Sequence, residues 1–228
     1  MMPLRDARVH LLVLHWGDPA VTLTCLASLR ACAPADTEVV VIDNGTPDHS
    51  GETLASEYPE FTHLRNETNL GFAGGNNVGL RRALERGAQC ALLLNNDAEI
   101  RPGAVEALVR AADADPRVGL INPKILYAEP EGMIWYAGGS HSLWRGHSSH
   151  IGRGEIDRGQ HDTACDVSFV TGCALLVRRA LLEEIGLLDE SLFMYAEDLD
   201  LGLRARRAGW RLRYEPGATV IHHERVRR

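Results

Sequence analysis

Short, almost wholly apolar segments recur along this chain, and each is followed by polar residues and then by a segment with helical periodicity. Arg8–Leu14, Glu38–Ile42 and Cys90–Leu94 are rich in Val, Leu and Ile and are predicted to be buried strands. One of the intervening helices is predicted to begin at Asp18-Pro19, where an N-cap residue precedes a proline. Strands that alternate with helices imply a parallel sheet with right-handed crossovers. The sequence therefore predicts an α/β fold.

The remaining elements are predicted from the same signals. Further strands are expected at 61–65, 118–122, 168–178, 210–214 and 218–221, and further helices at about 76–86, 102–112, 181–185 and 197–207. The segment 128–165 is rich in Gly, Ser and His without a clear period, so strand fragments and a mobile loop, acting as a lid, are predicted there.

Length and composition exclude several classes of protein. With 228 residues, 45% hydrophobic and 24% charged, the chain can bury a core and is not expected to be disordered. No apolar run reaches the roughly 18 residues of a membrane span, and the N-terminus lacks a signal-peptide pattern, so a cytoplasmic protein is expected. The five cysteines form no CxxC pair, which argues against a zinc ribbon or a redox motif.

The charge is acidic overall but unevenly distributed. A net charge of −7 argues against nucleic acid as a partner. The first 198 residues hold 16 basic and 28 acidic side chains, whereas the last 30 hold 8 basic and 3 acidic ones. This basic region ends in Arg225, Arg227 and Arg228, and it would suit phosphate groups or an anionic membrane surface. A solvated terminus is the simpler explanation.

Three polar or aromatic residues directly follow predicted strands. They are Trp16, Asp43 and Asp97. Ligands of open α/β sheets bind beyond the carboxyl ends of the strands, so these three side chains are predicted to face one crevice. A carboxylate at the position of Asp97, in LLLNNDAEI, can hold a divalent cation that neutralises a diphosphate. The alternative is that Asp97 caps the next helix.

Three further segments contain residues suited to chemistry. The glycines of NLGFAGGNNVG (69–79) permit close backbone approach to an anion at a helix N-terminus, or else form a tight turn. Glu197 and Asp198 begin a helix, where a carboxylate can act as a general base or simply cap the helix. His222 and His223 point to opposite faces of an extended chain, so one is expected to face the site as a metal ligand unless both are surface residues.

The order of these segments resembles a known family. VLHWGDP, VVVIDNG, NLGFAGGNNVGLRRAL, LLLNNDAEI, TGCALLVRR, EDLDLGLRARRAGW and IHH together resemble the family 2 glycosyltransferases, in their rhamnosyltransferase-like branch, from about residue 8 to 223. The resemblance implies the GT-A fold, a mostly parallel, Rossmann-like nucleotide-binding sheet with helices on both faces and a smaller acceptor-side β region. It also implies a single domain over residues 1–228, with a nucleotide-sugar-binding half at about 8–122 and an acceptor and catalytic half at about 123–228.

The resemblance further implies roles for particular residues. The nucleotide-sugar is expected to contact His15, Trp16, Asp43, Asn44, Gly71, Phe72, Gly75, Asn76, Asn95, Asn96 and Asp97. Asp97 matches the last acid of the family's DxD-type motif and is expected to bind Mn²⁺ or Mg²⁺ with His222, or secondarily His223. Asn95 replaces the first acid of that motif, which removes one charge near the metal.

The same resemblance places the acceptor side in the later half of the chain. Asp198 is expected to be the general base, with Glu197 beside it, and Thr171–Ala174 is expected to line the sugar and acceptor cleft.

The implied function is that of an inverting glycosyltransferase of bacterial cell-wall or polysaccharide biosynthesis. It would move a sugar, with rhamnose favoured, from a UDP- or dTDP-sugar to a hydroxyl of a glycan or lipid-linked acceptor, in the cytoplasm or at the inner face of the membrane. A sugar nucleotidyltransferase is the first alternative, but VLHWGDPAVT lacks the glycine-rich loop and basic residue of such enzymes. A non-catalytic sugar-nucleotide-binding or glycan-binding protein is the second.

Overall fold

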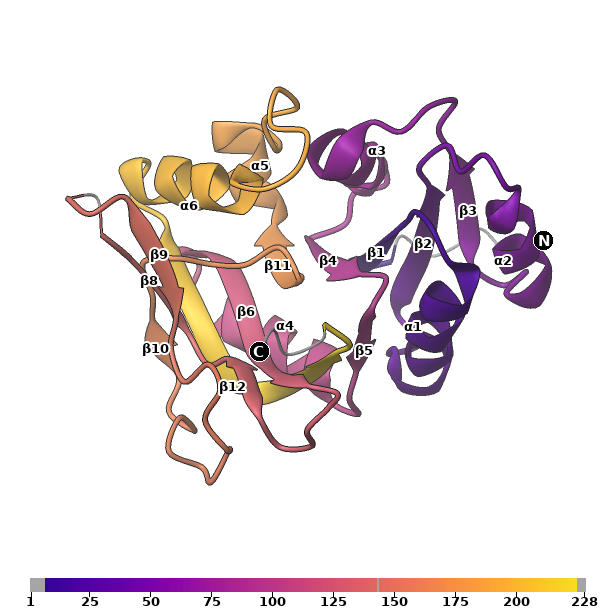
Figure 1. The fold of residues 1–228 in the computed structure, drawn as a ribbon. Coiled ribbons are helices and arrows are strands. Elements are labelled where there is room, and N and C mark those ends of the chain that lie inside the picture. The colour runs from indigo at the N-terminus through magenta and orange to yellow at the C-terminus, as the bar shows by residue number, and fades with distance from the viewer. Residues whose placement is uncertain (1–6, 143, 225–228) are drawn as a thin grey trace.

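The computed structural model describes residues 7–142 and 144–224. Most strands of these residues join in one sheet of ten strands, with the order β10-β12-β6-β11-β4-β1-β2-β3 and with β5 and β7 paired to β12 and β6 (Figure 1). The strands are β1 (Val9–His15), β2 (Thr37–Asp43), β3 (Thr62–Arg65), β4 (Cys90–Asn95), β5 (Ala98–Ile100), β6 (Val118–Tyr127), β7 (Ile134–Tyr136), β8 (Gly139–Ser142), β9 (His147–His150), β10 (Cys165–Asp166), β11 (Ala174–Arg178) and β12 (Arg211–His222). The helices are α1 (Pro19–Cys32), α2 (Ser50–Glu57), α3 (Gly71–Glu85), α4 (Ala104–Ala114), α5 (Arg179–Ile185) and α6 (Glu197–Arg207).

The direction of the strands brings several chain segments to one edge of the sheet. Strands β1, β2, β3 and β4 are parallel, and β6 is parallel to β12. Strand β11, in contrast, is antiparallel to both of its neighbours, β4 and β6. The residues that precede β11 therefore lie at the same edge as the carboxyl ends of β1, β2 and β4.

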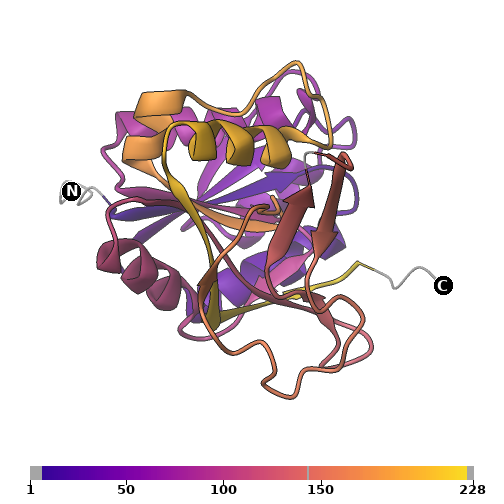
Figure 2. The same ribbon diagram turned by 90° about the vertical axis from the view of Figure 1, so that its left-hand side faces the viewer.

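The central strands are apolar on both faces, because helices cover both. Alternate residues of β1 point to opposite sides, with Leu11 and Val13 in one core and Leu12 in the other. The first core packs against α1, α2 and α4, and the second against α3, α5 and α6. Figures 1 and 2 show these two helical layers on opposite sides of the sheet. The expected α/β architecture is confirmed.

Helix α3 begins five residues earlier than the sequence predicts. The glycine-rich segment, predicted as a loop to Gly75, forms the first turns of α3 from Gly71. A Cβ atom on Gly75 would lie 2.5 Å from Leu14 Cδ1, and one on Gly79 would lie 3.0 Å from Ile42 Cδ1. These glycines therefore let the helix approach β1 and β2 closely, which outweighs their low helix propensity.

Other boundaries differ in smaller ways. Helix α2 and strand β5 were not predicted, and the two short strands expected at 210–214 and 218–221 form one irregular strand, β12. The strand expected from Ser168 starts only at Ala174, because the chain forms a turn at Gly172 and Cys173.

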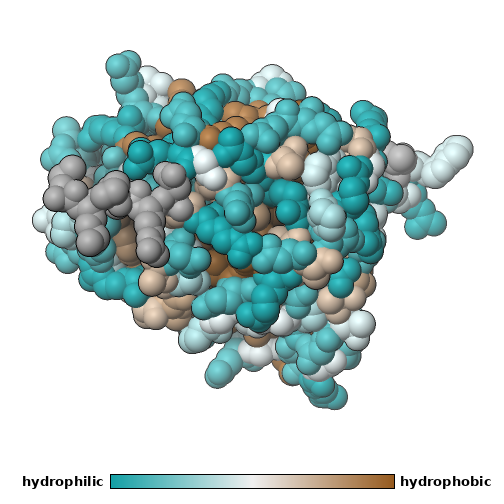
Figure 3. Space-filling view, turned by 180° about the vertical axis from the view of Figure 1, so that it is seen from behind, coloured by the Kyte–Doolittle hydropathy of each residue, from teal (hydrophilic) through white to brown (hydrophobic). Residues whose placement is uncertain are grey.

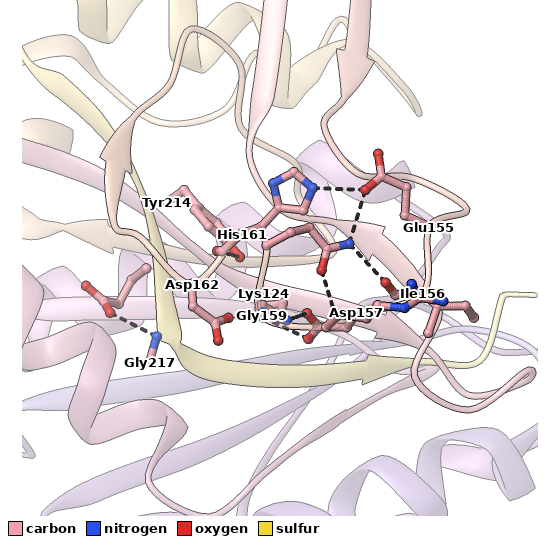
Figure 4. A network of polar contacts seen from close by, with 12 residues as sticks. Lys124, Glu155, Ile156, Asp157, Gly159, His161, Asp162, Tyr214 and Gly217 are labelled. Carbon is pink, nitrogen blue, oxygen red and sulfur yellow. Dashed lines mark hydrogen bonds and ion pairs between the residues drawn. The ribbon is translucent and has the colours of Figure 1, made fainter.

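Much of the segment predicted as a mobile lid is tied to the sheet. Residues of this segment form β7 and the β8–β9 hairpin. Lys124 of β6, only 6% exposed, donates to Asp157 Oδ2 at 2.8 Å and also pairs with Asp162. Tyr214 donates its hydroxyl proton to the carbonyl oxygen of His161 at 3.0 Å. Figure 4 shows Lys124 of β6 close to Asp157 and Asp162 of this loop. Residues 157–162 therefore lack the freedom that a lid requires.

The opposite face of the molecule, where the parallel strands begin, is largely hydrophilic (Figure 3). A hollow of about 400 Å³ between α4 and β12 is lined partly by Ala107, Ala111 and Arg213. No helix among residues 7–142 and 144–224 combines the length and the apolar character needed to cross a bilayer.

Candidate active site

Asp43 ends β2 directly beside the end of β1, since it pairs in register with His15. Its Oδ1 atom accepts hydrogen bonds from the backbone N–H and the hydroxyl of Thr46, both at 2.9 Å. Its Oδ2 atom is buried without a hydrogen-bond partner, and the nearest cation, Arg65 Nη1, is 3.5 Å away. Buried carboxylate oxygens are normally satisfied, so this atom is a candidate acceptor for a ligand N–H or O–H. Trp16, 46% exposed, follows His15 and offers an aromatic face at the same edge.

Both ring nitrogens of His15 already have hydrogen-bond partners in the protein, so they are not free for the expected contact with the nucleotide. His15 is fully buried, and Nδ1 and Nε2 lie 2.8 Å from the hydroxyls of Thr22 and Ser50. Burial lowers its pKa, which favours the neutral ring. Asn96 donates to the same Thr22 hydroxyl at 2.9 Å. His15 therefore ties the end of β1 to α1, α2 and the segment after β4.

Asn44 has a similar supporting role. Its Oδ1 accepts from Asn66 Nδ2 at 2.9 Å and from the N–H of Leu70 at 3.2 Å. Its Nδ2 donates to Asn69 Oδ1 at 2.9 Å and to the carbonyl of Gly71 at 3.1 Å. Because all four hydrogen-bonding positions of the amide are used, the side chain holds the start of α3 and has none left for a ligand.

The residues of the glycine-rich segment that are expected to contact the nucleotide also make contacts with other parts of the protein. Gly71 has φ +72°, and a Cβ atom there would lie 2.2 Å from the carbonyl oxygen of Phe193. Phe72 donates its N–H to that oxygen at 2.7 Å. Gly75 and Asn76 are buried, and Asn76 donates to the carbonyl of Phe72 at 3.0 Å. The start of α3 is thus joined to the segment that precedes α6.

Asp97 and His222 come together from opposite ends of the chain. Asp97 lies between β4 and β5, and His222 ends β12 opposite Ala98 of β5. The Nε2 atom of His222 is 3.2 Å from Asp97 Oδ1. The His223 side chain points the other way, and its Nε2 atom lies 2.5 Å from Glu99 Oε1. Of the two histidines, His222 is therefore the one that faces Asp97.

The Asp97–His222 pair fits a divalent cation. His222 Nδ1 is buried without a hydrogen-bond partner and Asp97 Oδ1 has the contact with His222 Nε2 at 3.2 Å, while the Asp97 side chain as a whole remains 35% exposed. Although burial opposes it, hydrogen bonding and charge from His222 lower the pKa of Asp97. No cluster of three His, Cys, Asp or Glu ligands occurs within 7–142 and 144–224. Mg²⁺-like ions need only one or two protein ligands when substrate phosphates complete the shell.

Two acids with raised pKa values stand at the start of α6. Glu197 is 6% exposed, its Oε2 atom has no partner, and burial raises its pKa to about 7. Burial also raises the pKa of Asp198, although the N–H groups of Gly172 and Leu199 donate to its carboxylate at 3.1 and 2.7 Å. Tyr195 and Ala196, just before these acids, have φ values of 73° and 71°. Backbone strain and perturbed carboxyl groups are typical of functional sites.

One short turn links the two groups of acids. Gly172 donates its N–H to Asp198 Oδ2, and Cys173 accepts at its carbonyl from the N–H of Asn95 at 2.9 Å. The turn Thr171–Cys173 thus lies between the strand that leads to Asp97 and the helix that carries Asp198. The sequence-predicted residues Asp43, Asp97, Asp198 and His222 are all brought to this edge of the sheet.

Sequence reasoning missed the residues that support His222. The indole N–H of Trp135 donates to Glu224 Oε2 at 2.5 Å. The rings of Trp135 and His222 pack edge to face, with their centroids 4.7 Å apart. The His222 Nδ1 atom is 4.0 Å from the same Glu224 carboxylate. Trp135 lies in the segment without a pattern, so no local signal pointed to it.

Comparison with known proteins agrees with this geometry. The model of the family "Glycosyl transferase family 2" matches residues 16–186. This chain belongs to glycosyltransferase family 2. It is 32% identical over 219 residues to an N-acetylglucosaminyl-diphospho-decaprenol L-rhamnosyltransferase of Mycobacterium tuberculosis, covering 87% of the chain and 70% of that relative. It is 27% identical over 199 residues to a low-salt glycan biosynthesis hexosyltransferase of Haloferax volcanii, covering 83% of the chain and 60% of that protein.

Solved structures show the same fold. GalNAc-T7, solved with UDP, GalNAc and Mn²⁺, superposes with a TM-score of 0.78 at 17% identity, over 96% of the chain and 44% of that protein. A mannosyltransferase of Pyrobaculum calidifontis, solved with GDP-Man and Mn²⁺, gives a TM-score of 0.68 at 17% identity, over 96% of the chain and 58% of that protein. The family 2 chain is thus a glycosyltransferase with the GT-A fold, of rhamnosyltransferase-like type, and it spans about half the length of these two solved structures.

Proposed function

We propose that this family 2 glycosyltransferase transfers a sugar, with inversion, from a UDP- or dTDP-sugar to a hydroxyl of a glycan or lipid-linked acceptor. The observation that carries the proposal is the Asp198 carboxylate. It lies in the first turn of α6, has a raised pKa, and is joined through the Thr171–Cys173 turn to the strand that leads to Asp97. A carboxylate whose proton affinity is raised by burial is suited to general-base catalysis near neutral pH.

In the proposed reaction Asp198 accepts the proton of the acceptor hydroxyl. The hydroxyl oxygen then forms a bond to the anomeric carbon, while the bond from that carbon to the diphosphate oxygen breaks on the opposite face. The products are the inverted glycoside and a nucleoside diphosphate. Glu197, whose pKa is about 7, lies beside Asp198 and is proposed to modulate its charge.

The donor is proposed to lie across the carboxyl ends of β1, β2 and β4. The Oδ2 atom of Asp43, which has no hydrogen-bond partner, supports nucleoside recognition there, and Trp16 supplies an exposed aromatic face. Asp97 and His222 are proposed to hold Mn²⁺ or Mg²⁺, which when bound supplies positive charge to the leaving diphosphate. The name of the mycobacterial relative supports L-rhamnose as the sugar.

A lipid-linked acceptor and peripheral contact with the inner face of the membrane form part of the same proposal. The mycobacterial relative is named for a diphospho-decaprenol acceptor. Phe193, Met194 and Tyr195, just before the two acids of α6, are exposed, and Trp144 at the end of the β8–β9 hairpin is fully exposed. Such side chains are frequent where proteins meet a membrane surface. The basic residues Arg225, Arg227 and Arg228 lie outside the described residues.

The decisive experiment compares Asp198→Asn with the unchanged enzyme. Transfer from dTDP-rhamnose, UDP- and GDP-sugars to a lipid-linked acceptor is measured with Mn²⁺ or Mg²⁺, and donor binding is followed by thermal shift. The variant is expected to bind donor normally and to lose turnover by on the order of 10²–10⁴-fold. Near-normal turnover would exclude Asp198 as the base. Pyrophosphate release from a nucleoside triphosphate, or donor binding without transfer or hydrolysis, would instead favour a nucleotidyltransferase or a non-catalytic binder.

A further inference from the structure

Asn122 of β6 is fully buried at the point where the pairing between β6 and β11 stops. The two strands pair at Ile121–Leu176 and Leu120–Val177, but not beyond. The next residue of β6 is Pro123, which has no N–H to donate to a ladder. The backbone groups of the chain just before β11 must therefore find other partners in the interior.

A single side-chain amide supplies these partners. The Nδ2 atom of Asn122 donates to the carbonyl oxygens of Thr171 and Ala174 at 2.8 and 2.6 Å. Its Oδ1 atom accepts the N–H of Thr171 at 3.0 Å. Asn122 thus holds both ends of the Thr171–Cys173 turn.

The Thr171–Cys173 turn also contacts Asp198. Gly172, in its middle, donates its N–H to Asp198 Oδ2 at 3.1 Å. Space around Gly172 is limited, since a Cβ atom there would lie 3.1 Å from the Phe72 ring and 3.9 Å from Asp198 Cβ. If Asn122 no longer held the turn, Gly172 could not move towards Phe72 and Asp198 without displacing the Phe72 ring or the Asp198 carboxylate.

The Gly172 N–H also influences the charge of Asp198. Burial raises the pKa of this carboxyl group, whereas the hydrogen bonds from Gly172 and Leu199 oppose the rise. Glu197 and Tyr136 both interact electrostatically with Asp198. Asn122 contacts Asp198 only through the turn.

We propose that Asn122 is a positioning residue for the reaction, because its amide holds the Thr171–Cys173 turn so that the Gly172 N–H meets the Asp198 carboxylate. The inference rests on the proposed function, in which Asp198 is the general base. Asn122 is 76 positions from Asp198 in the sequence, and it would help to set the geometry and the proton affinity of that base.

The test uses Asn122→Asp, which keeps the shape and the acceptor but replaces the donor with a carboxylate oxygen. We expect kcat to fall by on the order of 10–100-fold, as for a small misplacement of a catalytic group, while KM for the donor changes little. The acid limb of the kcat–pH profile is expected to move to higher pH, because a lost N–H donor favours the neutral carboxyl group. Asn122→Ser, which adds no charge, serves if Asn122→Asp does not fold.

Asn77→Asp is the matched control. Asn77 is also a buried asparagine whose amide holds a backbone segment, through the carbonyl and N–H of Leu188 at 2.9 and 3.1 Å, but it does not contact the turn. This variant is expected to lose stability without moving the acid limb. If the Asn122 variants lose only stability, with kcat and the acid limb unchanged, Asn122 is merely structural and the inference is overturned. An acid limb that persists in Asp198→Asn would instead refute the proposed base itself.

Discussion

Glu197 is the single residue whose environment departs most clearly from that of an ordinary surface carboxylate. Burial raises its pKa from 4.5 to about 7, and its Oε2 atom has no partner. A group with a raised pKa in the folded state stabilises the fold fully below the unfolded pKa. That contribution is lost as the pH rises through the folded value, here between about pH 4.5 and about 7.

Glu197→Gln is therefore expected to stabilise the protein at pH 8 and to have little effect at pH 4. The gain at pH 8 is at most about 3.5 kcal/mol, because each pKa unit corresponds to about 1.4 kcal/mol. Urea unfolding at the two pH values measures it. An equal change at both pH values would show that the effect comes from packing rather than from charge.

Asp97 provides a second prediction for a single residue. Asp97→Asn is expected to abolish the increase in donor affinity that Mn²⁺ gives to the unchanged protein, because one of the two proposed metal ligands loses its charge. Titration of the donor with Mn²⁺ and with EDTA, followed by thermal shift, checks this. His223→Ala is the control, since His223 pairs with Glu99 and faces away from Asp97. A donor affinity that still responds to Mn²⁺ in Asp97→Asn would remove Asp97 from the metal site.

At the scale of elements, the contact between α3 and the sheet depends on glycine. Gly75→Ala is expected to destabilise the protein by about 1–3 kcal/mol, because its Cβ atom would lie 2.5 Å from Leu14 Cδ1 and 3.1 Å from Asn44 Oδ1. Gly202→Ala in α6 is the control, because there the nearest atom is 3.3 Å away and helix propensity favours alanine. Thermal unfolding of both variants measures the difference. Equal stability of the two would contradict the close-packing role of Gly75.

The same element shows what sequence patterns could and could not predict. Strands β1, β2 and β4 were predicted within two residues, because buried parallel strands are apolar throughout. The start of α3 was predicted wrongly, because glycines that serve helix–sheet packing look like glycines of a loop. Helix α2 was missed because its sequence, SGETLASE, carries only one buried apolar residue, Leu54.

For the site, the pattern predicted the residues at strand ends but not those that support them. Asp43, Asp97 and His222 lie at one edge because parallel topology places strand ends together. Asn122, Trp135 and Glu224 act through contacts between distant parts of the chain; Trp135 and Glu224, for example, are 89 positions apart in the sequence. No local periodicity encodes such contacts.

At the scale of the whole molecule, Lys124 joins the later half of the sheet to the loop that crosses it. Lys124→Met is expected to lower the free energy of unfolding by about 1.5–3 kcal/mol, because charged hydrogen bonds to Asp157 and Asp162 are lost and the acids repel each other. Chemical denaturation measures the loss. Arg179→Met is the control, since its pair with Glu183 is exposed and contributes little. Similar losses for the two variants would contradict an anchoring role for Lys124.

The reversed direction of β11 has a consequence for engineering this enzyme. Because β11 enters the sheet at the ligand edge, residues 128–168 form a long excursion that leaves β6 after Tyr127 and returns just before the Thr171–Cys173 turn. Contacts within this excursion also hold it to the sheet, since Asp157 and Asp162 pair with Lys124 and the strands β7 and β10 pair with β6 and β12. A grafted excursion from another family member would need to keep the two acids that pair with Lys124, and it would then exchange the surface beside the ligand edge while the contacts of Asn122 stay in place.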